Sequence, residues 1–286
     1  MKGKIVLVTG ATSGIGRVTA RELARQGAKV VVVGRDPGKL DGIKREIGAD
    51  AIRADLQLLA EARRAAAEFR ARYARLDVLV NNAGALFGER RLTSEGLERT
   101  FALNHMAYFV LTTALLDVLR VSAPARVVSV SSEASRGGRI DFDDLQMERR
   151  YLGIRQYCNS KLMNLLFAFE LARRLQGTGV TSNALHPGAI ASGFAMQDAG
   201  WYGVLTRIAR PFLIGEEKGA RTTIWAASEP SLATVSGKYF VRRREKRPPR
   251  AALDGAAARR LWDESEKIAT ISSARAAVPT GSFSRT

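Results

Sequence analysis

The chain is poor in the residues that build disulfide frameworks, metal sites and membrane spans. Its one cysteine, Cys158, cannot form an internal disulfide, which favours a reducing compartment, so we expect a cytoplasmic protein. His105 and His186 lie far apart with no cysteine cluster, which argues against a metal site. No apolar run approaches the roughly 18 residues that a bilayer-spanning helix needs. Disulfide-stapled, metal-dependent and transmembrane classes are therefore disfavoured.

Acidic residues are also scarce, with 28 Asp and Glu against 45 Lys and Arg, for a net charge of +17. Such an excess raises the hypothesis of a nucleic-acid binder. The arginines are spread along the whole chain, however, and no nucleic-acid-binding motif accompanies them. We expect solvated helix faces and no nucleic-acid partner. The one dense basic cluster, residues 242–250, is interpreted as a solvated loop, with contact to an anionic membrane surface as the open alternative.

Apolar runs alternate with amphipathic stretches along the chain. Strands are expected at residues 4–9, 29–33, 50–54, 76–80, 126–130, 180–185 and 238–241, and helices at 17–26, 37–47, 56–74, 94–119, 151–175, 216–228 and 256–268. Unbroken apolar strands that alternate with helices predict a parallel sheet covered on both faces. We therefore expect one α/β domain over residues 1–269, with an apolar substrate lid at about 192–214, densest from Trp201 to Ile214, and a loose tail at 270–286.

A glycine-rich turn follows the first strand, where Lys4–Thr9 runs into Gly10-Ala-Thr-Ser-Gly14-Ile-Gly16. Gly10 allows a sharp turn, Gly14 allows backbone N–H groups to approach a pyrophosphate, and Gly16 allows close packing of the next helix. The phosphates would lie at a helix N-terminus, which favours anions. This pattern predicts a nucleotide site. A glycine turn without a ligand is the alternative if nothing else supports it.

Tyr157 and Lys161 lie four residues apart in a predicted helix, which places them on one face. An ammonium near a phenol favours the phenolate, so we expect Lys161 to lower the pKa of Tyr157. The pair could then act as a general acid or base. Taken alone, this spacing more often marks a solvated surface pair, so its companions decide the interpretation.

Those companions occur in a characteristic order along the chain. After the glycine turn come Asn81-Asn82-Ala83-Gly84, Ser131-Ser132, Tyr157-x-x-x-Lys161 and Pro187-Gly188, each after a predicted strand or within a helix. Together they resemble the short-chain dehydrogenase/reductase family over about residues 3–245. Asn104-His105, the long gap from Ser132 to Tyr157, and Ser236-Gly-Lys-Tyr-Phe240 further resemble its retinol dehydrogenase-like and WW-domain oxidoreductase-like members, without a WW domain.

The resemblance implies a Rossmann-type doubly wound sheet of seven parallel strands in the order 3-2-1-4-5-6-7, with the site beyond the carboxyl ends of the strands. It also implies catalytic roles. Tyr157 would be the proton donor or acceptor, Lys161 would lower its pKa and hold the nicotinamide ribose, and Ser132 would hydrogen-bond the substrate carbonyl. Asn104 would support a water relay to Lys161. Ser131, His105, His186 and Cys158 are not expected to take part in catalysis.

The same resemblance implies a set of cofactor contacts. Asp55 and the Leu56 backbone would meet the adenine, residues 82–84 would line the adenosine ribose, and Asn81 would fix the sheet. The backbone of Ile190 and the hydroxyl of Ser192 would meet the carboxamide. The full set expected to bind the cofactor is Gly10, Thr12, Ser13, Gly14, Ile15, Gly16, Arg35, Asp55, Leu56, Asn82, Ala83, Gly84, Tyr157, Lys161, Pro187, Gly188, Ile190 and Ser192.

The end of the second strand indicates which cofactor is preferred. In Rossmann proteins that prefer NAD, an acid about 20 residues past the glycine turn binds the ribose 2′-hydroxyl. That position is Gly34 here, and Arg35 follows, whose guanidinium suits a 2′-phosphate. Asp36 is the alternative acid, but its place before Pro37 makes it the better candidate for a helix N-cap. NADP(H) is therefore expected, with NAD(H) as the second choice.

The expected function is reversible hydride transfer between a nicotinamide cofactor and an apolar carbonyl or alcohol of retinoid, steroid or aldehyde type. A regulatory protein of the same fold without turnover is the first alternative, although Tyr157 and Lys161 are both present. A basic nucleic-acid binder is the second, and salt-dependent binding would reveal it. The substrate, the direction of the reaction and the choice between monomer and homodimer are open at this stage.

Overall fold

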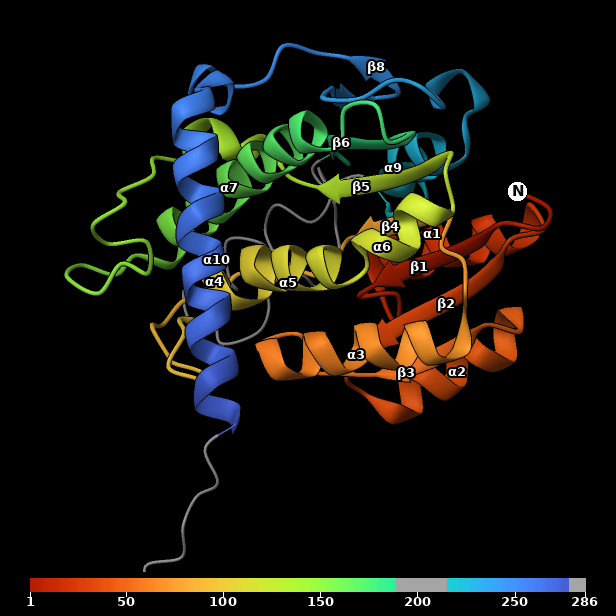
Figure 1. The fold of residues 1–286 in the computed structure, drawn as a ribbon, viewed down its shortest axis with the longest axis horizontal. Helices are drawn as coiled ribbons and strands as arrows, with labels where there is room; N and C mark the ends of the chain where they lie inside the picture. Colours follow the sequence, from red (N-terminus) through yellow and green to blue (C-terminus); the bar gives the residue numbers. More distant parts are fainter. Residues whose placement is uncertain (189–214, 278–286) are drawn as a thin grey trace, which may run out of the picture.

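The computed structural model describes residues 1–188 and 215–277, with side chains described as far as residue 272. One sheet in the order β3-β2-β1-β4-β5-β6-β7-β8 organises them (Figure 1). Its strands are β1 (Ile5–Thr9), β2 (Lys29–Gly34), β3 (Asp50–Arg53), β4 (Val78–Asn81), β5 (Ala125–Val130), β6 (Val180–His186), β7 (Tyr239–Val241) and β8 (Arg244–Glu245). The first seven are parallel, and β8 is antiparallel to β7. This is the expected Rossmann-like α/β arrangement.

The predicted count of seven strands was wrong by one. Arg242 and Arg243 adopt positive φ angles of 51° and 61°, which turn the chain back on itself directly after β7. The following pair, Arg244 and Glu245, then forms the short strand β8, and Lys238 and Glu245 form an ion pair at 2.8 Å across this hairpin. The first residues of the basic cluster therefore form a hairpin, although their side chains are largely exposed as expected for a solvated segment.

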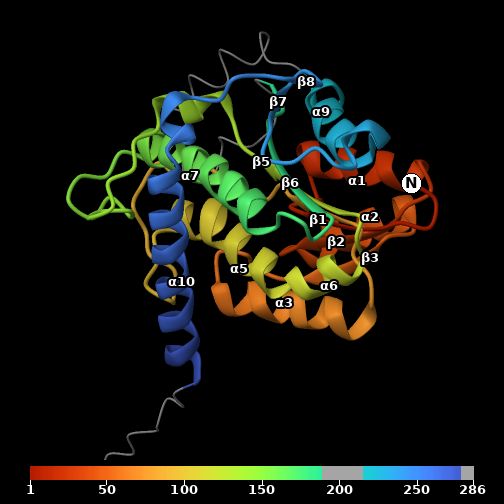
Figure 2. The ribbon, with the colours of Figure 1, turned by 45° about the horizontal axis from the view of Figure 1, so that its top comes forward.

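Helices cover both faces of the sheet, as Figures 1 and 2 show. On one face, Val6, Val8, Val30 and Val32 pack with α1 (Gly14–Arg25), α2 (Pro37–Ile47) and α9 (Glu216–Ser228). On the other, alternate residues such as Leu7 and Val31 pack with α3 (Leu59–Arg72), α5 (Ala107–Ala114) and α7 (Gly153–Arg174). Because the central strands β1, β2, β4 and β5 are buried on both sides, their residues are mostly apolar.

The predicted helix at 94–119 is interrupted in the structure. It consists of α4 (Arg99–Phe101), a π-helical turn η1 (Ala102–Met106), α5, and α6 (Leu116–Val121) after a break at Leu115. Short 3₁₀ turns occur at η2 (Glu133–Gly137), η5 (Pro230–Leu232) and η6 (Arg250–Leu253). The first of them occupies the start of the segment 133–150, which was predicted as a loop throughout.

The last helix, α10 (Gly255–Ala277), is longer than predicted. It was expected to end at Ile268, with a loose tail from residue 270, whereas residues 270–277 continue the helix. Alanine and arginine at 274–277 have high helix propensity, and an Arg63 guanidinium on α3 donates to the Ala269 carbonyl. Figures 1 and 2 show α10 running across α7 toward α3.

The predicted lid, Ile190 and Ser192 lie outside the described residues. Among the helices described, none combines the length and the apolar character that a membrane crossing requires.

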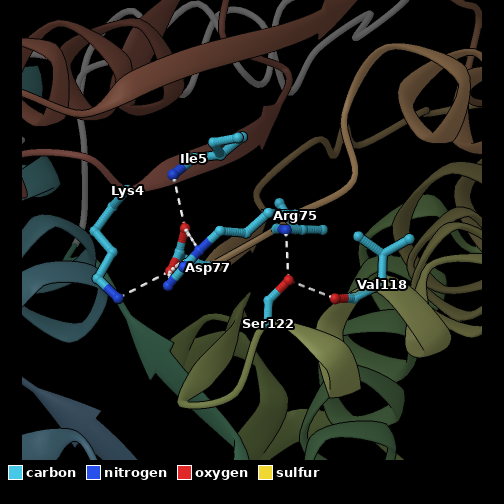
Figure 3. A network of polar contacts seen from close by, with 7 residues as sticks. Lys4, Ile5, Arg75, Asp77, Val118 and Ser122 are labelled. Carbon is cyan, nitrogen blue, oxygen red and sulfur yellow. Dashed lines mark hydrogen bonds and ion pairs between the residues drawn. The ribbon is translucent and has the colours of Figure 1, made fainter.

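A buried carboxylate ties β1 to the start of β4, at the edge of the sheet opposite the carboxyl ends of the strands (Figure 3). Asp77 is 2% exposed and accepts hydrogen bonds from the Ile5 amide at 2.9 Å, from Lys4 Nζ at 2.9 Å and from the Arg75 guanidinium at 2.6 Å. These donors lower the pKa of the Asp77 carboxyl even though burial raises it. The network stabilises the central strands without touching the candidate site.

Candidate active site

The glycine turn adopts the shape that the sequence predicts. Gly10 and Gly14 have φ angles of 64° and 57°, which residues with side chains rarely adopt. Gly16 lies in the first turn of α1, and a Cβ there would lie 2.3 Å from the Gly10 carbonyl oxygen and 2.4 Å from Asn82 Nδ2. No side chain fits at this position. The turn thus presents backbone N–H groups at the start of α1, where the helix dipole favours an anion.

The turn is held in place from β4. Asn82 Nδ2 donates to the Thr9 carbonyl at 2.8 Å and to the Gly10 carbonyl at 3.3 Å, and Thr9 Oγ1 accepts from the amides of Asn82 and Ala83 at 2.9 and 3.0 Å. The side-chain amide of Asn82 therefore holds the glycine turn in its shape. The predicted contact of Asn82 with an adenosine ribose stays a prediction. Thr9 was missed by sequence reasoning because its partners lie some 70 positions away. Asn81 donates to Thr112 Oγ1 at 2.9 Å, in agreement with its expected structural role.

Ser132, Tyr157 and Lys161 meet beyond the carboxyl end of β5. Ser132 caps η2, where its hydroxyl accepts from the Ala134 amide at 3.2 Å, and it hydrogen-bonds the Tyr157 phenol. Lys161 Nζ lies 5.5 Å from the centroid of the Tyr157 ring and donates to the Val130 carbonyl at 3.3 Å. The three predicted catalytic side chains are therefore brought together. Ser131, which was not expected to take part in catalysis, donates to the Lys161 carbonyl of α7 at 2.7 Å.

The pKa values in this group differ from the expectation. Burial raises the pKa of the Tyr157 phenol well above its ordinary value, and the hydrogen bond with Ser132 opposes this effect. Burial also lowers the pKa of the Lys161 ammonium to about 7. The prediction that Lys161 brings the Tyr157 pKa down was wrong for the side chains as they lie here. Both groups are removed from water, so the charged form of each is disfavoured and a partly neutral amine exerts a weaker field.

Asn104 lies in the π-helical turn η1 and is fully buried. Its Nδ2 donates to the Ala85 carbonyl at 2.9 Å and to Ser160 Oγ at 2.9 Å, while its Oδ1 accepts from the Ala85 amide at 2.8 Å. A Cβ on Gly84 would lie 3.2 Å from Asn104 Oδ1 and 3.3 Å from Lys161 Nζ, so both polar groups lie close to Gly84. The water relay between Asn104 and Lys161 stays a prediction.

The carboxyl ends of β2 and β3 border a surface hollow. It is lined by Arg35, Arg53, Asp55, Glu61, Arg64 and Glu68. Arg53 lies opposite Gly34 in the register of β2 and β3, which brings it next to Arg35. Arg53 and Arg64 were not predicted as part of the site. The pairing of β2 with β3 places Arg53 at the hollow, and helix α3 places Arg64 there. Asp55 Oδ1 accepts from the Gln57 amide at 3.0 Å, while its predicted contact with an adenine is untested.

The end of β2 carries no acid. A Cβ on Gly34 would lie 2.7 Å from Thr12 Cγ2, so a side chain at this position would require the Thr12 side chain to move. Asp36 Oδ1 accepts from the Lys39 amide at 3.0 Å and caps α2, as predicted. Its carboxylate is therefore used by the helix. Arg35 is the residue that directly follows β2.

The two histidines were not expected to take part in catalysis, and both occupy structural positions. His186 Nδ1 accepts from the amides of Glu133 and Gly188 at 3.1 and 3.4 Å, which is the turn role expected of it at the end of β6. His105 is buried among aromatic rings, as expected of a packing residue. Burial raises the pKa of the Cys158 thiol, which disfavours the reactive thiolate.

Four loops thus converge at one edge of the sheet: the glycine turn after β1, Asn82 after β4, Ser132 after β5 and Pro187-Gly188 after β6. In a doubly wound sheet this edge is where ligands bind. The arrangement provides an anion cradle, a hollow lined by three arginines and three carboxylates, and a serine–tyrosine–lysine group that can donate or accept a proton.

Comparisons with known proteins agree with this arrangement. The family model for short chain dehydrogenase matches residues 4–202. Human retinol dehydrogenase 12 is 41% identical over 272 residues, which cover 93% of this chain and 86% of that protein. The crystal structure of an uncharacterised protein from Mycobacterium paratuberculosis is 34% identical, with a TM-score of 0.78 over 94% of both chains. The RhlG/NADP complex from Pseudomonas aeruginosa is 28% identical, with a TM-score of 0.67 over 90% of this chain and 97% of that one.

Proposed function

Because the chain belongs to the short chain dehydrogenase family, we propose that it uses NADP(H) to interconvert an apolar alcohol and its carbonyl, with Tyr157 as the proton donor or acceptor. The chain is an NAD(P)-dependent dehydrogenase acting on alcohol groups. The observation that carries the proposal is the hydrogen bond between Ser132 and Tyr157 beside Lys161, at the same edge of the sheet as the glycine turn.

The residues present fit a dinucleotide. The turn from Gly10 to Gly16 can hold a pyrophosphate with backbone N–H groups, and its shape depends on Gly16, where a Cβ would clash with the Gly10 carbonyl and with Asn82. A bound nicotinamide supplies or accepts the hydride. The chain's own side chains would then manage the proton. Ser132 orients the substrate oxygen toward the Tyr157 phenol, the phenol exchanges the proton with that oxygen, and Lys161 holds the ribose hydroxyls beside it.

The test of this role removes only the phenol hydroxyl. We expect Tyr157→Phe to keep the fold, because the ring stays in its pocket, and to lower turnover by at least about 10²-fold, the usual loss for a general acid or base. Turnover is followed by absorbance of the reduced nicotinamide with a panel of aldehydes and alcohols. Cofactor affinity, measured separately by fluorescence titration, should change little. Near-normal turnover in this variant would refute the assignment.

The proposed NADP(H) preference rests on Arg35, on the capping role of Asp36 and on the glycine, in place of an acid, at position 34. A charge-assisted hydrogen bond is worth roughly 1.5–3 kcal/mol, which corresponds to a preference of about tenfold to a hundredfold. We expect Arg35→Asp to reverse the ratio of kcat/KM for NADPH to that for NADH. Arg70→Asp, an exposed change on α3 outside the hollow, is the matched control. A wild type that prefers NADH would overturn the proposal.

The substrate class is proposed from the apolar segment at about 192–214 and from relatives whose names specify retinol. Each additional buried methylene should improve kcat/KM by up to about 0.8 kcal/mol until the pocket is full. A series of straight-chain aldehydes of increasing length measures this directly. A flat series would contradict an apolar pocket. The cytoplasmic location and the oligomeric state stay predictions that neither the fold nor the relatives decide.

A further inference from the structure

Two side chains that are adjacent in the sequence hold the π-helical turn η1 from two sides. Asn104 binds Ala85 and Ser160, as described above. His105 instead reaches helix α10, where its Nε2 lies 2.8 Å from Ser265 Oγ. Both His105 and Ser265 are 1% exposed. A stretch of chain 160 positions downstream therefore contacts the turn that carries Asn104.

The direction of this hydrogen bond follows from the second bond that Ser265 makes. Ser265 Oγ also lies 2.7 Å from the Leu261 carbonyl, and a carbonyl can only accept, so the single hydroxyl proton is donated there. Ser265 must then accept from His105 Nε2–H. The other ring nitrogen, Nδ1, is buried and has no hydrogen-bond partner among the described residues. His105 is thus a neutral donor with one defined tautomer.

Aromatic packing holds α10 against this part of the chain. Trp262, one turn before Ser265, stacks on Phe167 of α7 with ring planes 10° apart and meets Phe109 of α5 edge-on at 4.9 Å. The His105 ring lies between Phe101, at 5.6 Å, and Phe167, at 6.4 Å. Because these rings are close-packed, the position of α10 determines the position of the His105 ring.

We propose that His105 and Ser265 are positioning residues, through which helix α10 holds the π-helical turn so that the Asn104 amide stays aligned with Lys161. A π-helical turn is a rare geometry that occurs mostly at functional sites and needs restraint from its surroundings. Asn104 restrains one side of the turn, and His105 restrains the other. This inference rests on the proposed function only for its catalytic consequence, because the alignment itself is a property of the chain.

The catalytic test is a double-mutant cycle. A displacement of about 1 Å can cost up to 10²-fold in rate, and we expect Ser265→Ala and His105→Phe each to lower kcat about tenfold at unchanged KM for the cofactor. In an Asn104→Ala background the same changes should lower kcat by less than about twofold, because the group they align is gone. Ser265→Thr, which keeps the hydroxyl, should restore kcat. Ser272→Ala removes another buried hydroxyl from α10, one without a hydrogen-bond partner in the described residues, and should leave kcat unchanged.

A second measurement does not depend on turnover. The side-chain amide resonances of Asn104 in a ¹⁵N–¹H spectrum should shift in Ser265→Ala and return in Ser265→Thr, while Ser272→Ala leaves them in place. With two histidines in the chain, the Nε2–H tautomer of His105 can be assigned in the same samples. A wild type without turnover on any carbonyl or alcohol would count against the proposed function alone. Unmoved Asn104 resonances, or equal losses of kcat in both backgrounds, would overturn the positioning role.

Discussion

Replacing Lys161 by methionine should make the folded chain more stable while it abolishes turnover. Lys161 is 2% exposed, and burial alone lowers the pKa of its ammonium from 10.5 to about 7. That difference corresponds to an upper limit of about 5 kcal/mol by which the folded state disfavours the charged amine. Methionine has a similar length, carries no charge and fills irregular apolar space.

The cost of losing the Lys161 hydrogen bond is small. Its acceptor, the Val130 carbonyl, also receives bonds from Asn164 Nδ2 at 3.3 Å and from the Tyr108 hydroxyl at 3.4 Å, so it keeps partners in the variant. After an allowance of about 1 kcal/mol for that bond, and for relaxation around a charged amine, we expect Lys161→Met to gain about 1–3 kcal/mol at pH 7. The wild-type chain is thus less stable at pH 7 because it keeps the lysine that its activity requires.

The pH dependence of this gain has a defined sign. The folded pKa of Lys161 is depressed, so the unfolded chain binds more protons than the folded chain between about pH 7 and pH 10.5. Wild-type stability should therefore rise across that window relative to Lys161→Met, and the advantage of the variant should shrink. Urea denaturation at pH 7 and pH 10 measures both differences, with exposed Lys218→Met as the control. A variant less stable than wild type at pH 7, or a gain that does not depend on pH, would refute this reasoning.

Two further changes test the sheet and the glycine turn. Asp77→Asn removes the buried carboxylate of Figure 3 and should lower the free energy of unfolding by about 2 kcal/mol. The loss is smaller than for a fully buried pair because Lys4 and Arg75 can turn to water. It is measured by denaturation at pH 7 and should fade as the pH drops below the ordinary carboxyl pKa. Gly16→Ala places a Cβ 2.3 Å from the Gly10 carbonyl and should raise the KM for the cofactor at least about tenfold, whereas Gly42→Ala on α2, which meets nothing within 4 Å, should leave it unchanged.

The central parallel strands were predictable because they are buried on both faces and therefore rich in apolar residues. The eighth strand was not, since Arg244-Glu245 carries no apolar signal and exists only because Arg242 and Arg243 turn the chain at positive φ. The helix predicted at 94–119 failed for a similar reason. Its composition is helical throughout, but the contacts of Asn104 with Ala85 accompany a π-helical turn that propensity does not reveal.

Local motifs indicated the catalytic side chains, whereas the groups that hold them came from distant segments. Tyr157 and Lys161 share one helix, so their spacing alone predicts that they are neighbours. Thr9, which fixes Asn82, has no signal of its own. Glu98 is a stronger case: it is fully buried, caps α4 and accepts from the Tyr151 hydroxyl and Gln156 Nε2 ahead of Tyr157. Such partners become visible only when the sheet brings their segments together.

The expectation of a lowered pKa for Tyr157 was wrong for the same reason, because the sequence does not show how the folded chain surrounds the side chain. Helical spacing predicts that the ammonium of Lys161 lies near the phenol of Tyr157, but it does not predict how much water remains between them. In the folded chain little remains, so burial raises the pKa of Tyr157 and lowers that of Lys161 to about 7. Among the causes of the Tyr157 shift, the hydrogen bond with Ser132 is the one that favours the phenolate. Ser132 therefore has two tasks in the proposed reaction, because it orients the substrate oxygen and also eases the release of the proton that Tyr157 must transfer.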